Sequence, residues 1–167
     1  MRQGASISAL ALALAVAGCG SDTVDPDKVE AGIEQSLSTA TAKVSSVSCP
    51  DDVEKKEGTT FTCDAKLEGG GKAKVKVTQT SNAGDYTYSF MPGTVVLTDN
   101  VLEPALEADL AASGVPGAKV DCPATVKVKT GETFTCTATG SEGRQSQLTF
   151  TFSSDDGTID ESSVSGA

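Results

Sequence analysis

Histidine and tryptophan are absent from the 167-residue chain, and aromatic residues make up only 4% of it. Without histidine there is no imidazole general base, no Ser/His or Cys/His nucleophile pair and no histidine-containing zinc site. Positive charge is also scarce, because 13 Lys and Arg face 23 Asp and Glu, for a net charge of -10. Proteins that bind nucleic acid hold its phosphates with Lys and Arg. We therefore expect no enzyme, no cofactor, no catalytic residue, no metal site and no nucleic-acid partner.

The chain starts with a segment typical of an export signal. Arg2 precedes an apolar stretch over residues 9–17, shorter than the ~20 residues of a membrane-spanning helix. The run from Val16 to Cys19 (VAGC) resembles the lipobox of bacterial lipoproteins. That resemblance implies that diacylglycerol is attached to the Cys19 thiol and that the peptide is cut just before this residue. An ordinary secretory peptide, with Cys19 incidental, is the alternative.

These features predict where the protein resides. Residues 1–18 would be a lipoprotein signal peptide and residues 19–26 a polar tether. The folded part would then lie outside the cell, on the outer face of the cytoplasmic membrane. An acidic chain is not attracted to an anionic membrane surface, so the lipid on Cys19 must supply the attachment.

The rest of the chain is a duplicated unit. A shift of 73 residues places Cys49-Pro50 on Cys122-Pro123 and Gly58 on Gly131. It also aligns Phe61 with Phe134 and Cys63 with Cys136. We expect repeat domains at residues 27–91 and 100–161, a linker at 92–99 and a flexible tail at 162–167. The linker is apolar at residues 95–97, which indicates some packing between the domains.

Each unit is expected to open with a helix. Asp27 and Asn100 are suitable N-cap residues, and Glu30 and Glu103 stand three places later, as in a capping box. Pro104 must then fall in the first turn of the second helix, or that helix begins a few residues later.

After the helix the apolar period changes to two, which indicates strands. Residues 60–67 place Phe61, Cys63 and Ala65 on one face, and residues 133–138 repeat the pattern. Residues 69–71 and 140–143 are the expected hairpin turns, and residues 86–90 a further strand in the first unit only. The predicted fold is α+β, with two tandem repeats. Each is an N-terminal helix on a three- to four-stranded antiparallel sheet with one internal disulfide.

Four cysteines remain beside Cys19, and four allow three pairings. The duplication favours one bond within each unit, Cys49 with Cys63 and Cys122 with Cys136, which an oxidising compartment permits. Closing such a loop contributes roughly 3 kcal/mol, which is a large share of a small domain's stability. A redox-active or metal-binding pair is the weaker alternative, because the spacing is not C-x-x-C.

Two further groups of residues are candidates for a binding site. Lys72, Lys74 and Lys76 point outward from one strand and form a candidate site for an anionic envelope polymer. Lysines in such positions also keep a sheet soluble, and the second unit has Gln145 and Gln147 instead of Lys72 and Lys74. The other group consists of carboxylates, read as calcium ligands, as acid/base groups or, more simply, as solvated turns. Its members are Asp51, Asp52, Asp155, Asp156, Asp160 and Glu161.

The helix, the Cys-Pro pair, the Gly-x-x-Phe-x-Cys motif and the hairpin together resemble domain-of-unknown-function family 4333 of actinobacterial exported proteins and lipoproteins. The motif residues are Cys49, Pro50, Gly58, Phe61 and Cys63, repeated at Cys122, Pro123, Gly131, Phe134 and Cys136. The resemblance implies a location and a fold, and no activity.

The sequence thus predicts a non-catalytic binding or interaction module of the cell envelope, with an envelope protein or polymer as partner. The alternative function is an inhibitor or regulator of an envelope enzyme, and an enzyme that uses carboxylates alone is a third possibility.

Overall fold

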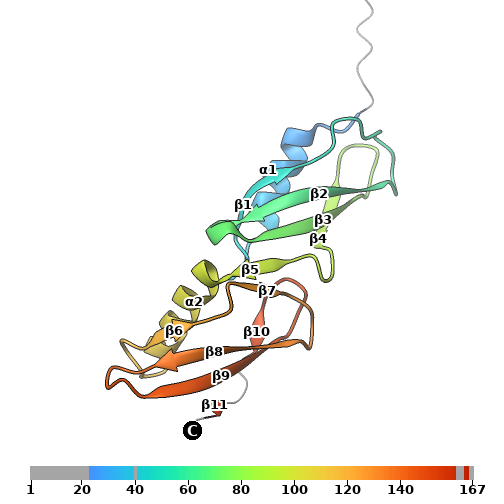
Figure 1. The fold of residues 1–167 in the computed structure, drawn as a ribbon. Coiled ribbons are helices and arrows are strands. Elements are labelled where there is room, and N and C mark those ends of the chain that lie inside the picture. Colours follow the sequence, from blue (N-terminus) through green and yellow to red (C-terminus); the bar gives the residue numbers. More distant parts are fainter. Residues whose placement is uncertain (1–22, 40, 161–163, 166–167) are drawn as a thin grey trace, which may run out of the picture.

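A computed structural model describes residues 23–39, 41–160 and 164–165 of the chain. It is α+β and consists of two tandem domains, one per repeat, as predicted. Figure 1 shows the first repeat in blue to green and the second in yellow to red, joined end to end.

Repeat one is a helix packed on a four-stranded antiparallel arrangement. Its elements are α1 (Pro26–Ser36), β1 (Val44–Ser48), β2 (Thr60–Leu67), the short 3-10 helix η1 (Glu68–Gly70), β3 (Lys72–Gln79) and β4 (Tyr86–Phe90). The helix buries Val29 and Ile33 completely. In β2 and β3, residues of alternating burial confirm the predicted period of two.

Repeat two has the same plan. Its elements are β5 (Val96–Thr98), α2 (Asp99–Ala112), β6 (Lys119–Asp121), β7 (Thr125–Lys127), β8 (Thr133–Thr139), β9 (Gln145–Phe152), β10 (Ile159–Asp160) and β11 (Val164–Ser165). Phe134 stacks on both Phe150 and Phe152, with ring centroids 5.3 and 5.1 Å apart. Phe134 and Phe152 are buried in the core, and the partly buried Phe150 packs against them.

Both predicted disulfides are present. Cys49 is bonded to Cys63 and Cys122 to Cys136, each pair 14 residues apart with Cα atoms 4.4 Å apart. Each bond ties the segment after the helix to the first strand of the long hairpin in its repeat, β2 or β8. The covalent link therefore holds together parts of the core that are distant in sequence.

The predicted helix caps are wrong. The N-cap residues are Asp25 and Thr98, so both helices begin earlier than Asp27 and Asn100, and Pro104 lies inside α2 rather than in its first turn. Pro26 starts α1 because its fixed φ suits the first helical position. Glu30 and Glu103 have a long-range partner instead. Their Oε1 atoms accept the backbone N–H of Cys49 (2.8 Å) and of Cys122 (3.1 Å).

The further strand is not confined to repeat one, which is a second correction. In repeat one β4 pairs with β3 through Tyr86 and Gln79, and in repeat two β10 pairs with β9 through Ile159 and Phe152. These pairs are related by the same shift of 73 residues. The sequence did not reveal that β4 and β10 are equivalent, because the aromatic residues of β4 have no counterparts in β10.

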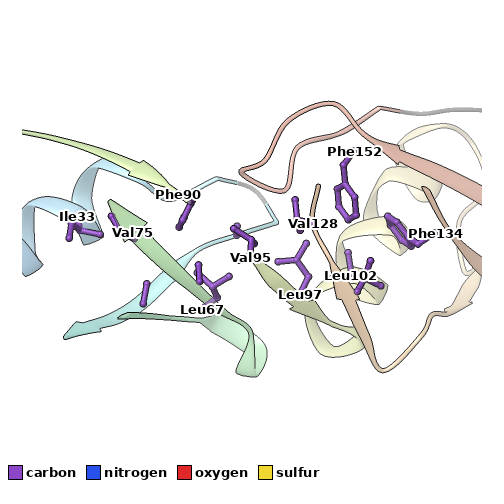
Figure 2. Close-up of a cluster of buried hydrophobic side chains, with 14 of the residues drawn as sticks. Ile33, Leu67, Val75, Phe90, Val95, Leu97, Leu102, Val128, Phe134 and Phe152 are labelled. Atoms are coloured by element: carbon purple, nitrogen blue, oxygen red, sulfur yellow. The ribbon is translucent and has the colours of Figure 1, made fainter. Parts of the chain in front are cut away.

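The strand β5 joins the two repeats. It pairs with β3 through Val96 and Lys72 and with β7 through Val96 and Lys127, so one sheet runs from β1 to β7. Val95 and Leu97 have 0% of their surface exposed, which confirms the predicted packing of the apolar linker. In Figure 2, Val95, Leu97 and Val128 lie between the core residues of the two repeats. The buried side chains form one cluster across the junction.

The segment before α1 plays the same part as β5 does before α2. Thr23 forms a bridge with Glu54, as Val96 does with Lys127, and Val24 is only 3% exposed. Residues 19–26 were predicted to be a tether, and the last residues of this segment therefore pack within repeat one.

The hairpin turn of repeat one, over residues 69–71, contacts the start of α2. The Gly69 carbonyl accepts a hydrogen bond from Thr98 Oγ1 (2.8 Å). A Cβ at Gly69, where φ is 70°, would lie 2.4 Å from the Val101 side chain. Gly69 is therefore required for the two repeats to approach this closely.

We predict that Gly69→Ala destabilises the protein more than Gly70→Ala. Both residues have positive φ, which costs an alanine about 1–2 kcal/mol, but only Gly69 faces a neighbour within 4 Å. The clash with Val101 should add about 1–3 kcal/mol. Denaturant unfolding of the two variants measures the difference, and equal losses would show that the turn is not packed against α2.

Candidate functional site: the lysine face of repeat one

The outer face of the sheet, opposite α1, carries side chains in rows that cross the strands. Residues paired directly across antiparallel strands point to the same face, so the register defines each row. One row contains Ser46, Lys66, Lys72, Val96 and Lys127. The next contains Ser48, Asp64 and Lys74, and a third contains Thr62, Lys76 and Ser89. We call Lys66, Lys72, Lys74, Lys76 and Lys127 the lysine face.

Two lysines of this face stand directly opposite each other. Lys66 of β2 pairs in register with Lys72 of β3, and like charges in this position repel. Within the described part of the chain, neither has a carboxylate partner. Lys74 differs, because its Nζ lies 2.7 Å from Asp64 Oδ1. The positive charge of the first row is thus uncompensated.

A solvent-open hollow of about 520 Å³ lies over these rows. Its polar lining comes from the first two rows and from Thr94 beside them, namely Ser46, Ser48, Asp64, Lys66, Lys72, Lys74 and Thr94. Thr94 is fixed in place, since its Oγ1 accepts the N–H of Lys74 (3.0 Å) and donates to the carbonyl of Met91 (2.7 Å). The hollow therefore presents ammonium groups and hydroxyls, which can hold an anion.

The structure brings together some of the lysines proposed from sequence. Lys72 and Lys74 line the hollow, whereas Lys76 stands one row beyond it. Sequence reasoning missed Lys66 and Lys127. The turn at residues 69–71 gave a signal for Lys66, because a hairpin closed there pairs residue 66 with residue 72. Lys127 joins the row only through β5, which the sequence did not reveal.

The same face of repeat two lacks these lysines, and Lys119, which stands there in the place of Ser46, is paired with Glu107 (3.1 Å). The positions of Lys66, Lys72 and Lys74 are occupied there by Thr139, Gln145 and Gln147, and that of Asp64 by Thr137. The backbone pairing is the same in both repeats. Repeat two is therefore a natural control for the effect of the lysines on the properties of this face.

A second hollow of about 370 Å³ lies where the two repeats meet, between the end of α1, β4 and the loop at residues 154–156. It contains Asp155 and Asp156 of the proposed carboxylate group. Both already have partners within repeat two. Asp155 Oδ1 accepts the N–H (2.9 Å) and hydroxyl (3.1 Å) of Thr130. Asp156 Oδ1 accepts the N–H (2.9 Å) and hydroxyl (2.7 Å) of Thr158 and the hydroxyl of Ser154.

The carboxylates proposed from sequence are not gathered at one place. Asp51 and Asp52 are exposed in a bend after Cys49, Asp160 is exposed in β10, and Glu161 lies outside the described residues. Among the side chains that the structure describes, no group of three or more His, Cys, Asp or Glu could hold a metal ion. Cys19 and the lipobox also lie outside the described residues. No helix in the described part is long and apolar enough to cross a membrane.

The fold and the pair of internal disulfides define a tandem-repeat α+β protein. Comparison with known families identifies which one. The sequence model of the family "Domain of unknown function (DUF4333)" matches residues 9–84 and 87–157, so the chain belongs to this family, in two copies. Searches among curated proteins and among solved structures found no match.

The hydrogen bonds of Asp156 give the loop at residues 154–158 a dependence on pH. Burial raises the pKa of Asp156, but the bonds from Ser154 and Thr158 outweigh it and hold this pKa below its ordinary value of 3.8. A lowered pKa in the folded state adds stability that is present above the unfolded pKa and is lost as the pH falls through the folded pKa.

We predict that Asp156→Asn costs about 1 kcal/mol at pH 7, because an amide oxygen accepts the same bonds without the charge that strengthens them, and costs less as the pH falls below about 4. Urea unfolding at pH 7 and pH 3 measures this, with Asp51→Asn as the exposed control. An Asp156→Asn effect that is equal at both pH values would contradict the role of the charged carboxylate.

Proposed function

We propose that the protein is an extracytoplasmic lipoprotein, anchored through diacylglycerol on Cys19 to the outer face of the cytoplasmic membrane. Its repeats act as a non-catalytic binding module. The VAGC run at residues 16–19 supports the anchor, and the disulfide in each repeat supports an oxidising compartment. Each buried methylene of an acyl chain contributes about 0.8 kcal/mol, so two chains hold the protein stably.

One observation carries the binding role. Lys66 and Lys72 face each other in register, line an open hollow and have no carboxylate partner among the described residues. A cross-strand lysine pair costs stability by itself, and an anionic ligand would remove that cost. The hollow's carboxylate, Asp64, is held by Lys74 (2.7 Å). This lining supports a ligand being held, with no group poised to transform it.

The anchor predicts a specific response to Cys19→Ala. The full-length chain, expressed in an actinobacterium with radiolabelled palmitate, should be labelled and found in the membrane fraction. The Cys19→Ala variant should lose both the label and the membrane association. Ser21→Ala serves as the control and should behave as the wild type. Membrane association of unlabelled Cys19→Ala protein would contradict the proposed anchor.

The binding role predicts where a ligand contacts the chain in the cell. A photoreactive amino acid at Ser48, in the hollow, should form a discrete covalent adduct when intact cells are illuminated. The matched position in repeat two is Asp121, which occupies the place of Ser48 after the shift of 73 residues and lies where Lys66, Lys72 and Lys74 have no lysine counterparts. Asp121 should give no such adduct. Equal labelling from both positions, or none from Ser48, would contradict a binding function of the hollow.

A further inference from the structure

We infer that the ligand of the lysine face is a linear phosphodiester polymer, in which a short polyol separates successive phosphates, and that Lys66 and Lys72 are its main contacts. This inference rests on the proposed binding function and names its ligand class. It depends on the kind of charge that the face carries, on its spacing and on the groups between the charges.

The cationic groups of the face are all lysines. A lysine ammonium is a compact point charge that binds an anion without a fixed orientation, whereas the planar fork of arginine holds a carboxylate or a phosphate in one bidentate geometry. The arginine that the structure describes, Arg144, lies in the hairpin of repeat two and pairs with Glu142 (3.0 Å). This face therefore suits a flexible chain of anionic groups that can meet each ammonium in any orientation, rather than one anion held in a fixed bidentate geometry.

Hydroxyls stand beside the lysines. Ser46 lies in the row of Lys66 and Lys72, Ser48 in the row of Lys74, and Thr62 in the row of Lys76. Serine and threonine hydroxyls donate hydrogen bonds to phosphate oxygens, as lysines do. The rows contain no aromatic side chain on which a sugar ring or the side chain of a protein partner could stack. The polar contacts thus favour a flexible, hydroxyl-bearing polyanion.

The charges are spread out rather than gathered at one point. Outward residues two apart on a strand are about 7 Å from each other, and adjacent strands are about 5 Å apart. Lys72, Lys74 and Lys76 follow one strand at this interval, while Lys66 and Lys127 extend the first row to both sides. This arrangement offers several well-separated contacts along a chain of singly charged groups.

An anionic membrane surface is a poorer fit. The chain has a net charge of -10, so a wide anionic surface would repel the rest of the protein. A slender polymer can reach the lysine face without approaching the acidic surfaces elsewhere. The lysine face of an acidic protein is therefore suited to a narrow ligand.

The test measures binding of a glycerol phosphate oligomer to the full lipidated chain in an uncharged detergent. Lys66→Gln/Lys72→Gln should weaken binding about tenfold or more, and the slope of log affinity against log salt should fall by about 0.7 per lysine removed. The matched control is Lys55→Gln/Lys56→Gln, which removes the same charge from exposed positions beyond the far end of β3. Its affinity should stay within about twofold of the wild type.

A second variant tests the sign of the charge at the hollow. Asp64→Asn removes the carboxylate that occupies Lys74 and should tighten binding several-fold, whereas the exposed control Asp51→Asn should not. Neither change removes a core side chain, so folding is preserved.

Three results would overturn the inference. They are equal weakening by the two lysine pairs, unchanged binding by Lys66→Gln/Lys72→Gln, and lysine-dependent binding to phosphatidylglycerol vesicles without binding to the oligomer. The in-cell adduct at Ser48 is independent of these results. An adduct there with a protein or a lipid would leave the binding function standing and exclude the polymer.

Discussion

The strand β5 is the constraint on which the rest of the structure depends. Its three residues, Val96–Thr98, pair with β7 of repeat two, and Val96 also pairs with β3 of repeat one. The side chains of Val95 and Leu97 are completely buried. Thr41 adds a bond across the junction, from its hydroxyl to the carbonyl of Gly157 (2.6 Å). Because the sheet is continuous here, Lys127 of repeat two joins the row of Lys66 and Lys72. Repeat two therefore contributes one lysine to the lysine face, beside a hollow lined by repeat one and the linker.

The two repeats have the same internal frame but different outer surfaces. A disulfide and a hydrogen bond from a Cys N–H to a helix glutamate hold both copies in the same way. On this common frame, the lysines of repeat one correspond to Thr139, Gln145 and Gln147 of repeat two. The two hairpins also differ in whether they can pack against a further strand. Gly71 lies against β5, where a Cβ would come within 2.7 Å of the Val96 carbonyl, and repeat two has Arg144 at that position. Its hairpin is thus unsuited to receive a further strand in the same way.

The sequence was informative wherever a short-range pattern decided the structure. Alternation around Phe61 and Cys63 predicted the strands, and the duplication selected the disulfides among three pairings. The sequence was uninformative where pairing between distant residues decided the structure. Glu30 has the spacing of a cap residue, but its partner is a backbone N–H 19 residues away. β5 is too short to show an alternating pattern, so neither its pairing nor the place of Lys127 could be predicted.

The central claim is that β5 makes the two repeats one cooperative body, and differential scanning calorimetry of the full lipidated chain in an uncharged detergent tests it most directly. A small domain that unfolds in one step has equal calorimetric and van't Hoff enthalpies. The account predicts a single transition with this equality for the oxidised protein. Two separate transitions, or a calorimetric enthalpy about twice the van't Hoff value, would show that the repeats unfold independently and would contradict it.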